Sequence, residues 1–162
     1  MVGIPGQGWD SLASDLETFR ALDLDMIGIG PYISYPATPL GTGEWPRVLP
    51  AGEQVPNSEL MVYKTVSLAR LVCPEANIPS TTALATINRE SGREFGLMRG
   101  ANAVMPNLTP IAYREKYEIY PGKSCINETA QACQLSLRHG IEAIGHHVGS
   151  GPAGRRRSGA EG

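Results

Sequence analysis

Short apolar runs alternate with amphipathic stretches along the chain. Each run is bounded by glycine or proline, which is typical of strands that end in tight turns. The amphipathic stretches repeat their apolar positions at spacings of three and four, which predicts helices. The predicted strands are residues 1–4, 25–30, part of 78–87, and 101–105. The predicted helices are residues 9–22, 58–72, 90–99, 110–117 and 129–144.

Two helices show the clearest pattern. In residues 9–22 the inner face is predicted to hold Leu12, Leu16, Phe19 and Leu22, with Asp10 or Ser11 as the N-cap. In residues 58–72 Asn57 or Ser58 is the expected cap, and Pro74 ends the helix. The expected inner side of this second helix consists of Val62, Val66, Ala69 and Leu71.

The order of elements is strand then helix, four times over. Strands that alternate with helices in this way pair in parallel through right-handed crossovers. The fold class is therefore α/β, either an open doubly wound sheet or part of a (β/α)₈ barrel. A complete barrel needs about 250 residues. Four βα units are half of one, although 162 residues would otherwise suit an ordinary single domain.

Composition narrows the function classes. The formal net charge is −2, so no strongly basic face predicts a nucleic-acid partner. No apolar run reaches the roughly 20 residues of a membrane span, and the start has no basic region followed by an apolar run, as a secretory signal would. Three cysteines are an odd number without a disulfide pattern, which favours a reducing, cytoplasmic location.

Ligands of parallel βα folds bind at the carboxyl ends of the strands. Four segments lie there, namely residues 3–7, 30–33, 81–83 and 105–107. They offer glycines, apolar side chains, two hydroxyls and an amide, which suit a cofactor or small ligand better than acid–base chemistry. The ordinary alternative is that turns after strands are rich in glycine and proline in any case.

The most specific polar signal is the pair Thr81 and Thr82. Adjacent hydroxyls at a strand end can donate to an anion or a small polar ligand. The structural alternative is that one threonine packs while the other binds backbone.

Other reactive residues give weaker signals. Cys125 and Cys133 are too few for an iron–sulfur cluster, which commonly takes about four thiolates, so free thiols are the simpler interpretation. No cysteine and histidine spacing matches a zinc site, and the arginine run 155–157 is most simply a solvated one. The sequence contains no GxSxG, HExxH, Walker A or GxGxxG motif.

Five strings occur in order along the chain, namely MVGIPGQ (1–7), LDMIGIGP (24–31), NIPSTTA (77–83), GANAVMPN (100–107) and YPGK (120–123). Together they resemble the C-terminal half of a radical SAM enzyme, and within that superfamily the HydE family of [FeFe]-hydrogenase maturases. The resemblance covers about residues 1–145. Biotin synthase and methylornithine synthase are related alternatives.

The resemblance implies a (β/α)₈ TIM barrel that holds a [4Fe-4S] cluster and S-adenosylmethionine (SAM). Such enzymes release a 5′-deoxyadenosyl radical, which in this family acts on an iron-bound cysteine precursor carrying CO and cyanide. The implied partners are two companion maturases, a tyrosine lyase and a scaffold GTPase, together with the missing N-terminal half of the barrel.

The resemblance also implies roles for single residues. The family's SAM-binding positions correspond here to Met1, Gly3, Pro5, Gly6, Ile33 and Tyr117. The family's substrate and anion cavity corresponds to Thr81, Thr82 and Met105. Hydroxyls can hold an anion, while methionine gives an apolar wall without a competing nucleophile.

Two departures from the family pattern concern its clusters. The CxxxCxxC motif that binds the catalytic cluster is absent from this sequence. An auxiliary cluster, which some members bind through C-x7-C-x2-C, would use Cys125 and Cys133, but Ser136 occupies the third position. We therefore expect a remnant of that auxiliary site rather than a working one.

The sequence-based hypothesis is a C-terminal fragment of a HydE-like radical SAM maturase that is inactive alone. Its expected organisation is half a barrel over residues 1–120, a C-terminal arm over 121–148 and a disordered tail over 149–162. A rival hypothesis of a different class is a free-standing α/β module that binds a small ligand without catalysis.

Overall fold

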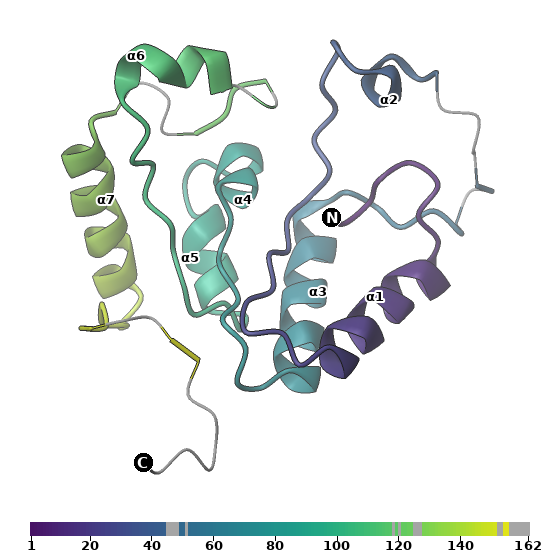
Figure 1. Ribbon diagram of the computed structural model, residues 1–162, viewed down its shortest axis with the longest axis horizontal. Coiled ribbons are helices and arrows are strands. Elements are labelled where there is room, and N and C mark those ends of the chain that lie inside the picture. The colour runs from purple at the N-terminus through teal and green to yellow at the C-terminus, as the bar shows by residue number, and fades with distance from the viewer. Residues whose placement is uncertain are drawn as a thin grey trace.

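A computed structural model describes residues 1–44, 49–50, 52–117, 119, 121–124, 128–151 and 154–155. Helices dominate this part of the chain (Figure 1). The longer ones are α1 (Trp9–Ala21), α3 (Glu59–Val72) and α7 (Ala130–Ala143). The shorter ones are α2 (Pro39–Thr42), α4 (Thr82–Ile87), α5 (Gly92–Leu97), α6 (Ile111–Arg114) and the 3₁₀ helix η1 (Glu115–Tyr117).

Four extended segments run between these helices, over residues 1–4, 25–31, 77–80 and 101–104. We refer to them as the first to fourth segments, and together as the parallel layer. Isolated parallel bridges join neighbours in that order: Val2 to Pro31, Met26 to Asn77, Ile29 to Ser80, and Pro79 to Ala103. No longer strand is assigned to them in the described residues. The partial TIM barrel itself remains a prediction.

Backbone hydrogen bonds follow the slanted pattern of parallel pairing. The Val2 N–H donates to Gly30 O at 2.9 Å, and the Tyr32 N–H donates back to Val2 O at 2.8 Å. The third and fourth segments are joined in the same way, from Ser80 N–H to Ala103 O at 2.9 Å. Each segment therefore lies beside the next one along the chain, as right-handed βα units require.

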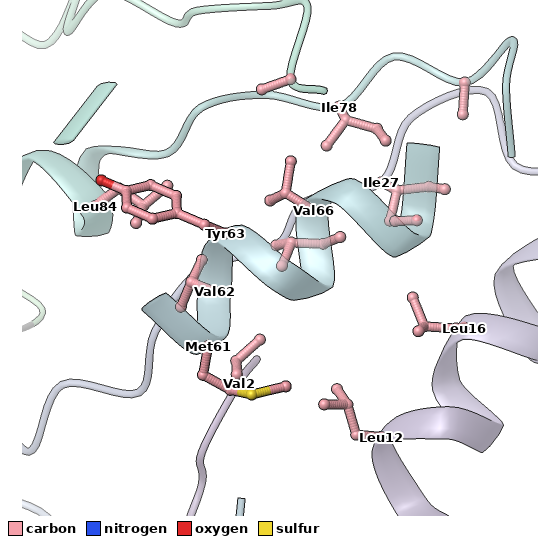
Figure 2. Close-up of a cluster of buried hydrophobic side chains, with 14 of the residues drawn as sticks. Val2, Leu12, Leu16, Ile27, Met61, Val62, Tyr63, Val66, Ile78 and Leu84 are labelled. Atoms are coloured by element: carbon pink, nitrogen blue, oxygen red, sulfur yellow. The ribbon is translucent and has the colours of Figure 1, made fainter. Parts of the chain in front are cut away.

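One face of the parallel layer is covered by helices. Val2, Ile27 and Ile78 point into a buried cluster that also contains side chains of α1 and α3 (Figure 2). Ile29 belongs to the same cluster. The helical side chains of that cluster include Leu12, Leu16, Met61, Val62, Tyr63 and Val66. Because alternate residues of an extended chain face opposite sides, the residues between these apolar ones lie on the other face.

The helix predictions for residues 9–22, 58–72 and 129–144 are confirmed to within one or two residues by α1, α3 and α7. Ser58 caps α3 by accepting a hydrogen bond from Met61 N–H. The predicted cap of α1 is wrong, because Gly8 is the N-cap and makes no side-chain bond. Local periodicity locates a helix well, but it does not fix the first residue.

Two apolar positions assigned to inner helix faces are also wrong. Leu22 is exposed because α1 ends at Ala21, and Leu22 itself is the C-cap. Leu71 is 76% exposed. It follows Val62 by nine residues, which at 3.6 residues per turn places it about half a turn away on the opposite face.

The strand expected within residues 78–87 is shorter than that range. Ser80 is the last residue of the third segment, and Thr81 already caps α4. The run TALATI is apolar enough for a buried strand, and short runs of this kind do not distinguish strand from helix by periodicity. In the described residues no helix is long and apolar enough to cross a membrane.

Candidate functional site

A cavity of about 690 Å³ lies at the carboxyl ends of the second and third segments. Its volume falls within the roughly 300–1,000 Å³ typical of small-molecule sites. Four predicted site residues line it, namely Met1, Ile33, Thr81 and Thr82. The other lining residues are Gly28, Gly30, Pro31, Tyr32, Tyr35, Thr38, Leu40, Ala83 and Ile119.

The cavity lies on the face of the parallel layer that helices do not cover. In the second segment Ile27 and Ile29 enter the core, while Gly28 and Gly30 line the cavity. A Cβ atom on Gly30 would lie 3.0 Å from Thr81 Oγ1, so a larger residue there would press on the threonine. Because Gly28 and Gly30 have no side chains, they leave this side of the cavity free of side-chain atoms.

Thr81 has a structural role that the sequence left open. It is the N-cap of α4, and its hydroxyl oxygen accepts a long hydrogen bond of 3.5 Å from Leu84 N–H. An acceptor role leaves the hydroxyl proton of Thr81 able to donate. Thr82 is the first residue of α4, and its carbonyl accepts from Thr86 Oγ1 at 2.9 Å. The pair thus combines a helix cap with a polar edge of the cavity.

The turn formed by residues 3–7 supports the cavity from outside. Gly3 has φ +77° and donates its N–H to Oε1 of the buried Gln7 at 2.7 Å. The Gln7 amide then donates to Met1 O at 3.1 Å. The turn therefore holds Met1 in place, although Gly3, Pro5 and Gly6 are not among the lining residues of the cavity.

Gln54 is a supporting residue that sequence reasoning missed. Its side-chain oxygen accepts from Gly6 N–H at 2.8 Å, and its side-chain NH₂ donates to Ile4 O at 3.1 Å. Nothing in the local sequence signals this contact, because Gln54 lies 48 residues from Gly6. The glycine N–H groups of the turn are thus bound by Gln7 and Gln54.

Tyr117 and Met105 are not brought to the cavity. Tyr117 ends η1 and is 62% exposed, with Lys123 Nζ 5.1 Å from its ring centroid and donating to its carbonyl at 3.2 Å. Met105 follows the fourth segment and is also exposed. Neither is a lining residue, whereas the neighbouring Ile119 is.

The cysteines do not form a metal centre in the described residues. Cys133 is fully buried on the inner side of α7, while Ser136 three residues later is exposed. Cys73 is the C-cap of α3. Cys125 lies outside the residues that the structure describes. Within those residues, no three His, Cys, Asp or Glu side chains gather as a metal site would require.

Arg114 organises the chain that follows the fourth segment, and no local sequence pattern indicates this role. Its side chain is only 3% exposed. Its Nε donates to Thr109 O at 2.6 Å, and its Nη2 donates to Asn107 O at 2.9 Å. Its Nη1 donates to Glu128 O, just before α7. One guanidinium therefore ties the loop after Met105 to the start of the last helix.

Two linked pKa shifts outside the cavity lining are those of Glu59 and Tyr63 in α3. Tyr63 OH donates to Glu59 Oε1 at 2.5 Å, and Asn88 Nδ2 donates to the same oxygen at 2.7 Å. These two hydrogen bonds lower the pKa of Glu59. Burial, followed by the bond to Glu59, raises the pKa of Tyr63. The group fastens α3 to the α4–α5 region and is a structural feature.

Comparison with known proteins places these observations in a family context. No protein-family profile matches the chain. The [FeFe] hydrogenase maturase subunit HydE of Thermotoga maritima is 43% identical over 157 residues. The match covers 97% of this chain but only 42% of the length of that protein. The chain therefore spans less than half of the relative that it matches.

Identity at this level along almost the whole chain is strong evidence of common descent, and the length relation fits a C-terminal part of a longer enzyme. The resemblance indicated by the five sequence strings is thus confirmed, and the chain is similar to the HydE hydrogenase maturases of the radical SAM superfamily along nearly its entire length.

Proposed function

We propose that the chain forms the C-terminal part of a radical SAM hydrogenase maturase and contributes half of its cofactor and substrate cavity. The observation that carries this proposal is the 690 Å³ cavity at the carboxyl ends of the parallel layer. Ligands of parallel βα folds bind at that end. The similarity to HydE supports SAM as the proposed class of ligand.

The uncovered face of the parallel layer supports the same proposal. Parallel sheets normally have both faces covered. Here helices cover one face, while Met1 and Met26 remain exposed. Exposed apolar surface next to a cavity is typical of an interface. We infer that the remainder of a (β/α)₈ barrel covers this face in the longer protein.

The lining residues fit a nucleoside-type cofactor. SAM, when bound, would supply the 5′-deoxyadenosyl radical that the family uses. Ile33 and Met1 would give apolar contacts to the adenosyl group, and the Thr81 hydroxyl would donate to a polar or anionic part of the ligand. Because the protein's task is to orient the reactive group and exclude side reactions, walls without strong nucleophiles suit it.

The residues described here do not fit an iron–sulfur cluster. The cysteines that the structure describes are Cys73 and Cys133, and in the described part of the chain no three His, Cys, Asp or Glu side chains gather as a cluster site would require. We propose that the chain alone does not cleave SAM. The proposed substrate, an iron-bound cysteine with CO and cyanide, and the two proposed companion maturases rest on the resemblance. The proposed cytoplasmic location rests on the odd number of cysteines without a disulfide pattern.

Anaerobic reconstitution tests this proposal. Residues 1–162 are purified, treated with iron and sulfide, and assayed for 5′-deoxyadenosine after addition of SAM and dithionite. We expect no stoichiometric [4Fe-4S] cluster and no reductive cleavage. A cluster with turnover from this chain alone would contradict the proposal. SAM binding is measured separately by calorimetry, where Thr81→Val should weaken it and the exposed Thr42→Val should not.

A further inference from the structure

The guanidinium of Arg155 occupies an acidic pocket far from the candidate cavity. Its Nη2 lies 2.6 Å from Asp23 Oδ1 and 3.3 Å from Glu75 Oε2, and its Nη1 lies 3.9 Å from Asp25 Oδ1. Its Nη1 also donates to Asp23 O at 3.0 Å. The side chain of Arg155 is only 12% exposed. A planar guanidinium with several donors suits such a set of carboxylate and carbonyl oxygens.

This acidic pocket lies at the amino ends of the parallel layer. Asp23 and Asp25 precede and begin the second segment, and Glu75 precedes the third segment. Arg155 therefore bridges residues that lie 80 to 132 positions earlier in the chain. The contact joins Arg155 to the end of the parallel layer opposite the candidate cavity.

Residues 146–151, which follow α7, lie beside the fourth segment. His146, His147 and Val148 line a cavity of about 600 Å³ together with Ala101 and Asn102 of the fourth segment. Gly145 N–H and His146 N–H close the end of α7 by donating to Glu142 O and Ile141 O. The chain after α7 thus passes beside the start of the fourth segment.

We propose that Arg155 is a latch that fastens the C-terminal segment across the base of the parallel layer by binding the acidic pocket of Asp23, Asp25 and Glu75. The segment then shields the start of the fourth segment, which is an edge of the parallel layer. Covering an edge protects its unpaired backbone groups from pairing with other chains. The latch consists of this chain's own residues and does not depend on the proposed function.

Cys73 provides a natural reporter of the latch. It lines the same small cavity of about 110 Å³ as Arg155, Asp23 and Glu75, and its thiol is free. Cys133 is fully buried and serves as an internal reference. In a Cys125→Ser background, a maleimide reagent alkylates the two remaining thiols, and mass spectrometry measures the rate at each one. Release of Arg155 should open the cavity and expose Cys73 alone.

The expected result is that Arg155→Ala accelerates alkylation of Cys73 several-fold and leaves Cys133 protected. Arg155→Lys should give an intermediate rate, because it keeps the charge but loses the planar fork. Arg138→Ala, which removes the same charge from an exposed pair on α7, should leave the Cys73 rate unchanged. An unchanged Cys73 rate in Arg155→Ala would overturn the proposal.

Salt tests the latch without any substitution. At about 1 M NaCl the Debye length falls to about 3 Å, which weakens ion pairs with exposed partners such as Asp23. The Cys73 rate of the unsubstituted chain should rise with salt, while that of Arg155→Ala should stay constant. If salt raises the Cys73 rate equally in the unsubstituted chain and in Arg155→Ala, or raises the Cys133 rate as well, salt destabilises the whole fold. Either result would contradict the latch.

Discussion

The two faces of the parallel layer use the same four segments in opposite ways. On the covered face Val2, Ile29 and Ile78 are buried against α1 and α3. On the open face Met1, Gly28 and Gly30 surround a cavity. The first set provides hydrophobic stabilisation, which grows with the apolar area removed from water. The second set leaves space for a ligand and for the rest of a larger protein.

This difference implies that stability and function are separable in this chain, residue by residue. Alternation along an extended segment places a core residue next to a cavity residue. A substitution on the covered face should therefore unfold the protein, while its neighbour on the open face should affect only binding. The predictions below test that separation, from the largest expected effect to the smallest.

Truncation of the covered face should have the largest effect. Ile78 is fully buried in the third segment, and Ile78→Ala should lower the free energy of unfolding by about 2–5 kcal/mol. Met26→Ala, at an exposed position of the second segment next to the buried Ile27, should change it by no more than about 0.5 kcal/mol. Urea denaturation followed by circular dichroism measures both. Similar losses in the two variants would mean that the faces are not distinct.

The turn beneath Met1 should tolerate no side chain at Gly3. In Gly3→Ala the new Cβ would meet the Asn57 backbone, and the left-handed φ of +77° adds strain. Gly43 has a similar φ of +81° but open space around it, so Gly43→Ala isolates the conformational cost of about 1–2 kcal/mol.

Gly3→Ala should therefore cost about 1–3 kcal/mol more than Gly43→Ala, because the clash adds to the strain. The same urea titration gives both values. Equal costs would show that contact between this turn and Asn57 does not matter.

The smallest effect concerns acid stability. Hydrogen bonds from Tyr63 and Asn88 lower the pKa of Glu59, so the ionised form stabilises the fold. This contribution is present above the ordinary pKa of 4.5 and is lost as pH falls through the lowered folded value. Because Glu59 is partly exposed, solvent screening keeps it below about 1 kcal/mol.

Thermal melts between about pH 6 and pH 3 measure this effect. Glu59→Gln should flatten the acid limb of the stability curve. Tyr63→Phe, which removes the first cause of the lowered pKa, should flatten it as well. If the melting temperature falls with pH as steeply in both variants as in the unsubstituted chain, the pH dependence comes from other carboxyl groups.

The sequence predicts local features of this molecule better than long-range ones. The inner faces of α1 and α3 follow from spacing alone at Leu12, Leu16, Val62 and Val66. The ends of elements do not, because Gly8 and Thr81 take cap positions that competing residues also suit. The likeness to HydE was accessible from sequence because it depends on the order of motifs and not on contacts.

The candidate site shows the same limit. Ile33, Thr81 and Thr82 meet at the cavity because the carboxyl ends of parallel segments share one edge. Met1 begins the first segment and reaches the same edge because Val2 pairs with Pro31 at the carboxyl end of the second segment. Gln54 and Arg155 bind partners that only the fold brings close, and no local pattern reveals these contacts or the burial of Arg114. The roles of Gly3, Pro5, Gly6, Tyr117 and Met105 in binding SAM or substrate stay predictions.

The most direct test of the central claim is complementation of the open face. This chain is mixed with the part of Thermotoga maritima HydE that lies outside the match, reconstituted with iron and sulfide, and assayed for 5′-deoxyadenosine formed from SAM. The account predicts that the two parts associate and that only the mixture cleaves SAM. Cleavage by this chain alone, or a complete failure of the two parts to associate, would contradict it.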